Sequence, residues 1–122
     1  MEQTTLKARL KDFVLKNSEG FTIGFNLEKP THKKGFYVGV TDNSNTNLNQ
    51  AIDKLFKICE KDFKGVNKNS FFIGGWIDKN TNIFYLDLSV YIENKKNALL
   101  MAKLFKQKAI WDIKKQDSIY LN

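Results

Sequence analysis

The residues best suited to chemistry in this chain are two lysines in a predicted loop and several aromatic side chains in predicted strands. The loop, residues 32–35, contains Lys33 and Lys34, and lysine ammonium groups beside free backbone amides suit phosphate oxygens. Aromatic rings offer faces for a nucleobase, and stacking is worth about 1–3 kcal/mol per base. A solvated loop without a ligand is the alternative interpretation of the lysines. The candidate stacking residues are Phe36, Tyr37, Trp76 and Tyr85.

Three aspartates and the single histidine are the remaining candidates for acid–base or metal chemistry. Asp78, Asp87 and Asp112 would have to converge in space, and the sequence does not show that they do. His32 has no nucleophile placed beside it, so we expect a solvated loop histidine. One histidine and one cysteine cannot supply the usual zinc ligands, and no phosphate-binding glycine loop or nucleophile elbow is present. We therefore predict that the protein is not an enzyme and has no cofactor and no metal.

Residues 70–92 position several of these side chains and are predicted to form one β-hairpin. The asparagine-rich turn, residues 79–82, tolerates left-handed conformations and would pair Asp78 with Ile83. Since side chains of a strand alternate between two faces, this register gives one apolar face and one mixed face. The mixed face contains the cross-strand pairs Trp76–Tyr85, Gly74–Asp87 and Phe72–Ser89.

The mixed face has two interpretations. An aromatic pair, a carboxylate and a glycine on one surface could form a stacking platform with room for a ligand above Gly74. Alternatively, a helix or a second subunit covers Trp76 and Phe72, which is the more usual outcome because large aromatic side chains are mostly buried. A register shift of one residue would exchange the two faces.

Helices and shorter strands are predicted around this hairpin. Apolar residues at helical spacing predict helices over residues 4–16, over residues 48–63 after a cap at Thr46 or Asn47, and after a cap at Asn94. Alternation predicts strands over residues 21–25 and 36–40, paired as a second hairpin, and over residues 109–113 and 118–121. The order α-ββ-α-ββ-α-ββ predicts a single α+β domain with two or three helices on a largely antiparallel sheet.

Composition restricts the class of partner. The chain has 122 residues and a net charge of +7, which favours anionic partners. All but one of its 20 basic residues are lysine, whereas specific base recognition relies on arginine; an AT-rich genome would also enrich lysine and asparagine. No apolar run approaches the about 20 residues that cross a bilayer. The first residues lack the apolar core of a signal peptide, so we expect a cytoplasmic protein without membrane contact.

The last predicted helix is apolar around most of its circumference. A small sheet cannot cover all of it, which predicts a partner chain and therefore a symmetric homo-oligomer.

Six short segments spread over most of the chain carry a family resemblance. They are Gly20-Phe21-Thr22-Ile23, Pro30-Thr31, Gly35-Phe36-Tyr37-Val38, Gly74-Gly75-Trp76-Ile77-Asp78, Tyr85-Leu86-Asp87-Leu88-Ser89 and Gln107-Lys108-Ala109-Ile110-Trp111-Asp112. This pattern resembles a family of small phage and mobile-element proteins. Within that setting the chain resembles the Thoeris anti-defence sponges, phage proteins that sequester a cyclic ADP-ribose signal. The scarcity of arginine is a departure, because lysine and backbone amides would have to hold the phosphates.

These observations predict capture of a small nucleotide without turnover, in an infected or lysogenic bacterial host. Aromatic rings would stack on the base, lysines would contact phosphate, and Asp or Asn would bind ribose hydroxyls. The alternative is a basic macromolecule binder, either a nucleic-acid-binding module or a protein inhibitor of a host nuclease. The residues that we predict to contact the ligand are Lys33, Lys34, Phe36, Trp76, Tyr85, Asp87, Gln107, Lys108 and Trp111.

Overall fold

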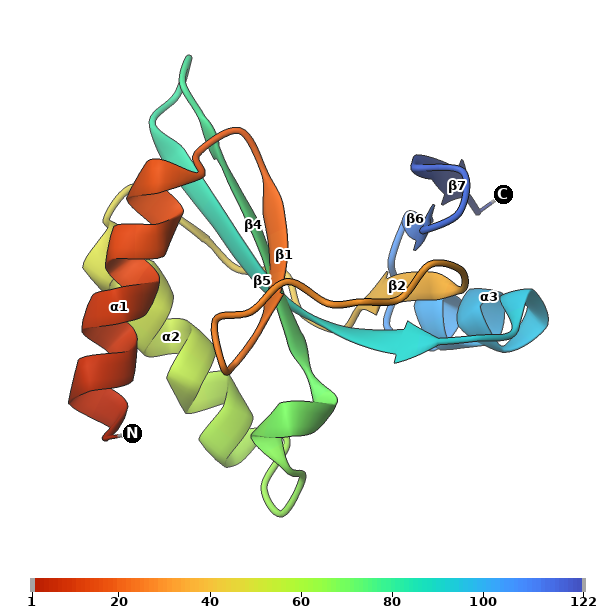
Figure 1. Cartoon of the computed structure of the whole chain (residues 1–122), viewed down its shortest axis with the longest axis horizontal. Helices are drawn as coiled ribbons and strands as arrows, with labels where there is room; N and C mark the ends of the chain where they lie inside the picture. The colour runs from red at the N-terminus through yellow and green to blue at the C-terminus, as the bar shows by residue number, and fades with distance from the viewer. Residues whose placement is uncertain (1, 122) are drawn as a thin grey trace.

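The backbone forms one antiparallel sheet with three helices packed against it, an α+β fold as predicted (Figure 1). The computed structural model describes residues 2–121. The helices are α1 (Gln3–Lys16), α2 (Leu48–Lys61) and α3 (Lys95–Leu104), with a short 3-10 helix at Lys68–Ser70. The strands are β1 (Phe21–Gly24), β2 (Phe36–Gly39), β3 (Ser44–Asn45), β4 (Phe72–Asp78), β5 (Ile83–Ile92), β6 (Ala109–Asp112) and β7 (Asp117–Tyr120).

The central hairpin has the predicted register. β4 pairs with β5 so that Asp78 lies opposite Ile83 and Trp76 opposite Tyr85. Asn82 in the connecting turn has a φ of 58°, the left-handed conformation that asparagine tolerates better than most residues. The predicted helix caps are also present, since the side chains of Asn47 and Asn94 accept hydrogen bonds from backbone amides in the first turns of α2 and α3.

The prediction of a second hairpin from residues 21–25 and 36–40 is wrong. The strand order is β1-β4-β5-β2-β6-β7, with β3 also paired to β5, so the whole central hairpin lies between β1 and β2. β1 pairs with β4 and β2 pairs with β5. Alternation identifies a strand but does not encode its partner, and the two long strands offer free edges on both sides. The connection from β1 to β2 must therefore pass over β4 and β5.

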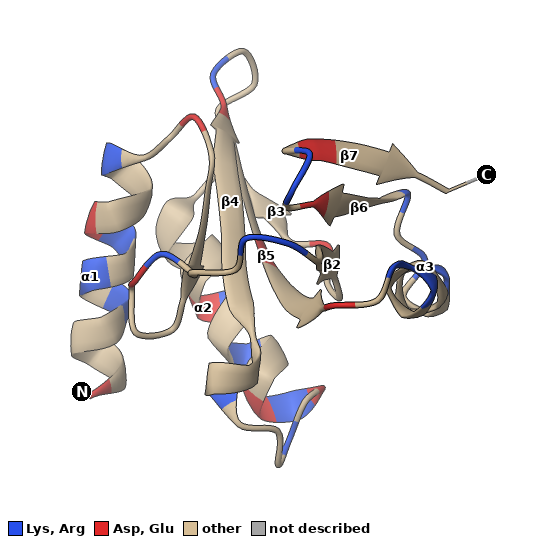
Figure 2. Cartoon of the chain, turned by 45° about the vertical axis from the view of Figure 1, so that its right-hand side comes forward, with Lys and Arg blue, Asp and Glu red and all other residues tan. Residues whose placement is uncertain are grey.

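All three helices cover the same face of the sheet. Leu86 and Leu88 of β5 pack in one hydrophobic cluster with α1 and α2, and Val38 of β2 packs in a second cluster with α3. Val90 contacts both clusters, and it lies opposite Val38 on the face that also carries Leu88. The opposite face carries Trp76, Tyr85, Asp87 and other side chains of the mixed set, and within residues 2–121 no helix covers it (Figure 2).

The outer side of α3 leaves two leucines exposed. Leu100 is 59% exposed and Leu104 is 74% exposed. The homo-oligomer that would cover them stays a prediction. None of the helices within residues 2–121 is long and apolar enough to cross a lipid bilayer.

Candidate functional site

Phe25 and Leu27, at the start of the connection between β1 and β2, pack in the helix-covered core, and the later part, residues 28–35, forms a strap across the helix-free face (Figure 2). The ring of His32 anchors it by stacking on Tyr91 of β5 at a centroid distance of 3.6 Å and an interplanar angle of 4°. The same ring meets Phe72 of β4 edge-on, and its Nδ1 lies 3.1 Å from the Oη of Tyr37. The prediction of a solvated loop histidine is therefore wrong, because this loop crosses an aromatic surface.

The far end of the strap is held by hydrogen bonds to two of its backbone carbonyl groups. Tyr91 Oη donates to the carbonyl of Lys34 at 3.0 Å, and the amide of Ile113 donates to the carbonyl of Gly35 at 3.0 Å. Gly35 has a φ of +99°, and a Cβ there would lie 2.6 Å from the Tyr91 ring. Only glycine fits this position, which explains the Lys-Gly step at the end of the strap.

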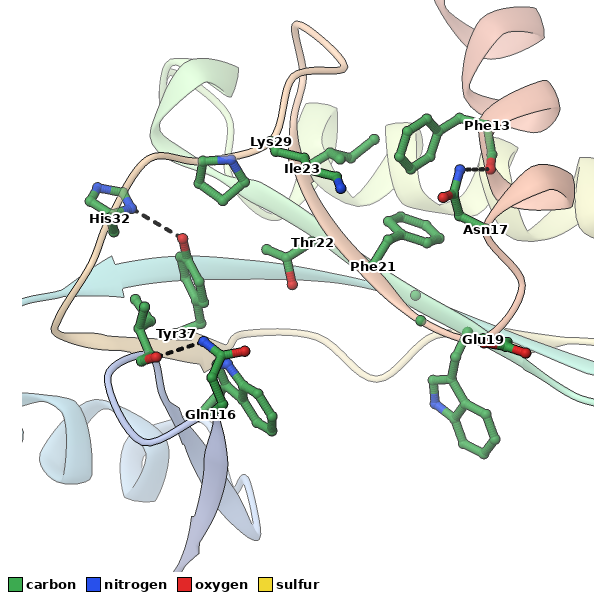
Figure 3. A pocket seen from close by; sticks show the side chains of 16 residues that line it. Phe13, Asn17, Glu19, Phe21, Thr22, Ile23, Lys29, His32, Tyr37 and Gln116 are labelled. Atoms are coloured by element: carbon green, nitrogen blue, oxygen red, sulfur yellow. Dashed lines mark hydrogen bonds between the residues drawn. The ribbon is translucent and has the colours of Figure 1, made fainter.

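A cavity of about 700 Å³ lies beside β1, at the edge of the sheet, and extends onto this face (Figure 3). Its size falls within the usual range for small-molecule sites, about 300–1,000 Å³. The lining comes from distant parts of the fold, from β1 at one edge of the sheet to β6 near the other edge. The contributors include Phe13 of α1, Asn17 and Glu19 just after it, Phe21 and Thr22 of β1, Lys29 and His32 of the strap, Tyr37 of β2, Trp76 of β4, and Trp111, Ile113 and Gln116 in and after β6.

Trp76 is an exposed member of this cavity. Its side chain is 46% exposed, and its indole stacks on Tyr85 at a centroid distance of 4.7 Å and an angle of 10°. The interpretation in which a helix of this chain buries Trp76 is therefore wrong. Phe72 is half-buried, but by His32 and Tyr37 rather than by a helix. Tyr85 thus supports one face of an indole that lines the cavity.

Trp111 brings a second indole to the same cavity from the other end of the sheet. It lies opposite Tyr37 in the β2–β6 pairing and is 38% exposed. The structure therefore brings together Trp76 and Trp111 from the predicted set, with Tyr85 directly behind Trp76. Phe36 faces the other way and packs against the cluster around α3, because its neighbour Tyr37 takes the cavity side of the strand.

Asp87 supports the sheet next to the site and does not line the cavity. Its Oδ1 accepts a hydrogen bond from the backbone amide of Asn43 at 2.6 Å. Burial raises the pKa of Asp87 from about 3.8 to about 6; the Asn43 bond lowers it, the nearby Asp42 raises it, and Thr41 lowers it. The three aspartates considered above do not converge, and within residues 2–121 no three His, Cys, Asp or Glu side chains are placed to hold a metal ion.

The predicted lysines lie outside the cavity. Lys29, Lys33 and Lys34 are all exposed on the strap, but of the three only Lys29 lines the cavity. Gln107 packs over β2, where a Cβ on Gly39 would come within 2.9 Å of its Oε1, and Lys108 is exposed. Sequence reasoning missed Lys29, Glu19 and Gln116, because only the crossing of the strap over the sheet brings them together.

Comparison of the chain with protein-family models, with curated protein sequences and with solved structures finds no match.

Proposed function

We propose that this protein captures a small nucleotide in the cavity under the strap and holds it without chemical turnover. The observation that carries the proposal is that two exposed indoles, Trp76 and Trp111, line the same cavity as Lys29. An aromatic base and an anionic phosphate are the two features of a ligand that such a lining recognises.

The geometry around Trp76 suits stacking in particular. Tyr85 lies nearly parallel to the indole at 4.7 Å, so the indole is held in place before a ligand arrives. A rigid, preformed ring loses little conformational freedom on binding, which favours affinity. Thr22, Asn17 and Gln116 in the lining supply hydrogen-bonding groups for sugar hydroxyls or base edges.

The resemblance to anti-defence sponges gives this capture a biological role. A protein that only sequesters a signal needs affinity and no catalytic group. Cyclic ADP-ribose isomers are therefore the first members of the panel of nucleotides to test.

The test incubates the protein with each nucleotide, removes free ligand, denatures the protein by heat and identifies what is released by mass spectrometry. Stoichiometric release of intact ligand, lost in Trp76→Ala, is the expected result. A chemically altered ligand would identify an enzyme instead. If no nucleotide is depleted from solution, the proposal fails.

A second candidate is binding of single-stranded nucleic acid, favoured by the exposure of Trp76 and Trp111 on a face without helices. Single strands bind by stacking on exposed aromatic side chains and by lysine–phosphate contacts. A gel shift with a labelled oligonucleotide at low and at moderate salt tests this candidate. Retention that falls steeply with salt supports it, because each neutralised phosphate releases counterions. Absence of retention at low salt rules it out.

A further inference from the structure

The charge of the cavity differs from the charge of the chain. The chain carries a net charge of +7, and Figure 2 shows its basic residues distributed over the helices, the strap and the connecting turns. Among the described residues that line the cavity, Lys29 is the only lysine or arginine, and Glu19 is the only carboxylate. Apart from the His32 imidazole, which stacks on Tyr91, the other lining residues are neutral.

The end of α1 adds further negative character to the same cavity. Asn17 caps the C-terminus of α1, and Glu19 follows two residues later, both in the lining. A helix C-terminus carries a partial negative charge, and here the amides of Asn17 satisfy the carbonyl groups of Phe13 and Val14 while leaving those of the final residues of α1 without a helical partner. Lys16 is the only basic residue in the last turn, and it forms an ion pair with Asp12 at 3.0 Å. The α1 side of the cavity therefore opposes the approach of an anion.

Figure 3 places Lys29 and Glu19 on different sides of the cavity, with the ring of Phe21 between them. The ammonium group of Lys29 can contact the oxygen atoms of one phosphate. A second phosphate would extend from Lys29 toward Glu19 and the end of α1, or out into solvent. Glu19 is exposed, and each additional negative charge brought near its carboxylate is repelled.

From this arrangement we infer that the cavity selects a nucleotide with a single, singly charged phosphodiester, such as a cyclic nucleoside monophosphate, over nucleoside diphosphates. Lys29 contacts the phosphodiester, the indoles of Trp76 and Trp111 line the space for the base, and Glu19 accepts hydrogen bonds from sugar hydroxyls or an exocyclic amine. This inference rests on the proposed function, and it narrows the class of ligand from any small nucleotide to one of low charge.

The experiment measures dissociation constants by calorimetry for uncharged adenosine, cyclic AMP, AMP, ADP and cyclic ADP-ribose. The buffer is held at about pH 8, above the range in which an ordinary histidine titrates. Cyclic AMP is expected to bind more tightly than ADP. Lys29→Ala should raise the dissociation constant of cyclic AMP by about tenfold or more, because one charge-assisted contact is lost. The same variant should change the dissociation constant of adenosine by less than about twofold.

Two further variants separate the cavity from the general charge of the chain. Lys33→Ala/Lys34→Ala removes two strap lysines that do not line the cavity and should leave every dissociation constant within about twofold. Glu19→Lys should reverse the preference and bind ADP more tightly than the wild type does, by about threefold or more.

The outcomes are distinct. If affinity rises steadily from adenosine to ADP, or if the Lys33/Lys34 variant loses binding, the inference is overturned while the proposed function stands. The same holds if cyclic ADP-ribose binds more tightly than cyclic AMP. If none of the five compounds binds, the proposed function fails and the inference fails with it.

Discussion

The Oδ1 of Asp87 accepts a hydrogen bond from the backbone amide of Asn43 at 2.6 Å, and this contact joins β5 to the segment between β2 and β3. The hydroxyl of Thr41 accepts from the amide of Leu88 at 2.9 Å in the same place. The side chain of Asn43 continues the link by donating from Nδ2 to the carbonyl of Ala51 in α2 at 2.9 Å. The carboxylate of Asp87 therefore replaces hydrogen bonds between strands at the gap between β2 and β3, where regular pairing with β5 is interrupted.

Asp87 makes stability depend on pH in the acid range. Because its folded pKa is raised to about 6 from about 3.8, the folded state binds a proton more readily than the unfolded state between these values. The stabilising contribution is present below about pH 4 and is lost as the pH rises through about 6. Asp87→Asn keeps an oxygen acceptor for the Asn43 amide and removes the titration.

The measurement is the difference in melting temperature between wild type and Asp87→Asn from about pH 7.5 to about pH 4.5. The melting temperature of the wild type should rise relative to that of the variant as the pH falls through about 6, because all other titrating groups are shared. A difference that does not change with pH would contradict the raised pKa.

Trp76→Ala should abolish ligand binding with a modest effect on stability. The side chain is 46% exposed and its main partner is Tyr85, so we expect a loss of about 0.5–1.5 kcal/mol, the worth of one aromatic pair. A fully buried tryptophan would cost about 3–5 kcal/mol instead. Urea unfolding measures the stability and calorimetry the binding. Trp76→Phe is the control, since it keeps a ring over Tyr85 and should retain part of the stability and part of the binding affinity.

Gly35→Ala should destabilise the fold and detach the strap. The substituted residue would have to keep a φ of +99° with its Cβ 2.6 Å from the Tyr91 ring. Strain of this kind costs about 1–3 kcal/mol, measurable by urea unfolding. Gly65→Ala is the matched control. Gly65 also has a positive φ, +85°, but no atom lies within 4 Å of the added Cβ, so the excess loss in Gly35→Ala reports the contact with Tyr91.

His32→Ala should weaken ligand binding although the imidazole need not touch the ligand. The substitution removes the stack on Tyr91 and the contact with Tyr37, which hold the strap and therefore Lys29. We expect the dissociation constant to rise by about threefold to tenfold, because one anchoring contact worth about 1 kcal/mol is lost. His32→Phe keeps the stack and should restore most of the affinity. Equal losses in both variants would assign the effect to the imidazole nitrogen atoms.

The oligomer prediction depends on Leu100 and Leu104 of α3, the two exposed leucines of that helix. If a second copy covers them, light scattering should give a dimer or larger species at micromolar concentration, and Leu100→Ser/Leu104→Ser should convert it to a monomer. A wild-type monomer at that concentration would remove the support for a homo-oligomer.

The sequence was sufficient to predict features that depend on neighbouring residues. The turn after Asp78 and the alternation along β5 determine the register of the central hairpin, and Asn47 and Asn94 mark the helix starts. The partners of β1 and β2 could not be predicted, because alternation defines the faces of a strand and not its position in a sheet. The cavity depends on those partners. Trp76 and Trp111 were identified as aromatic candidates, but Lys29 rather than Lys33 or Lys34 lines the cavity, and this follows only from the path of the strap.

The path of the strap also constrains the order in which the molecule assembles. His32 touches Phe72, Tyr91 and Tyr37, and the first two lie far along the chain in β4 and β5. The full set of these contacts needs β4 and β5 side by side, so we expect the strap to dock late in folding. By the same reasoning it can lift in a local opening that leaves the sheet paired, because the ladder of β4 and β5 does not depend on it. Amide exchange in the strap should therefore be faster than in the central hairpin, and a ligand can enter and leave the cavity without unfolding of the sheet.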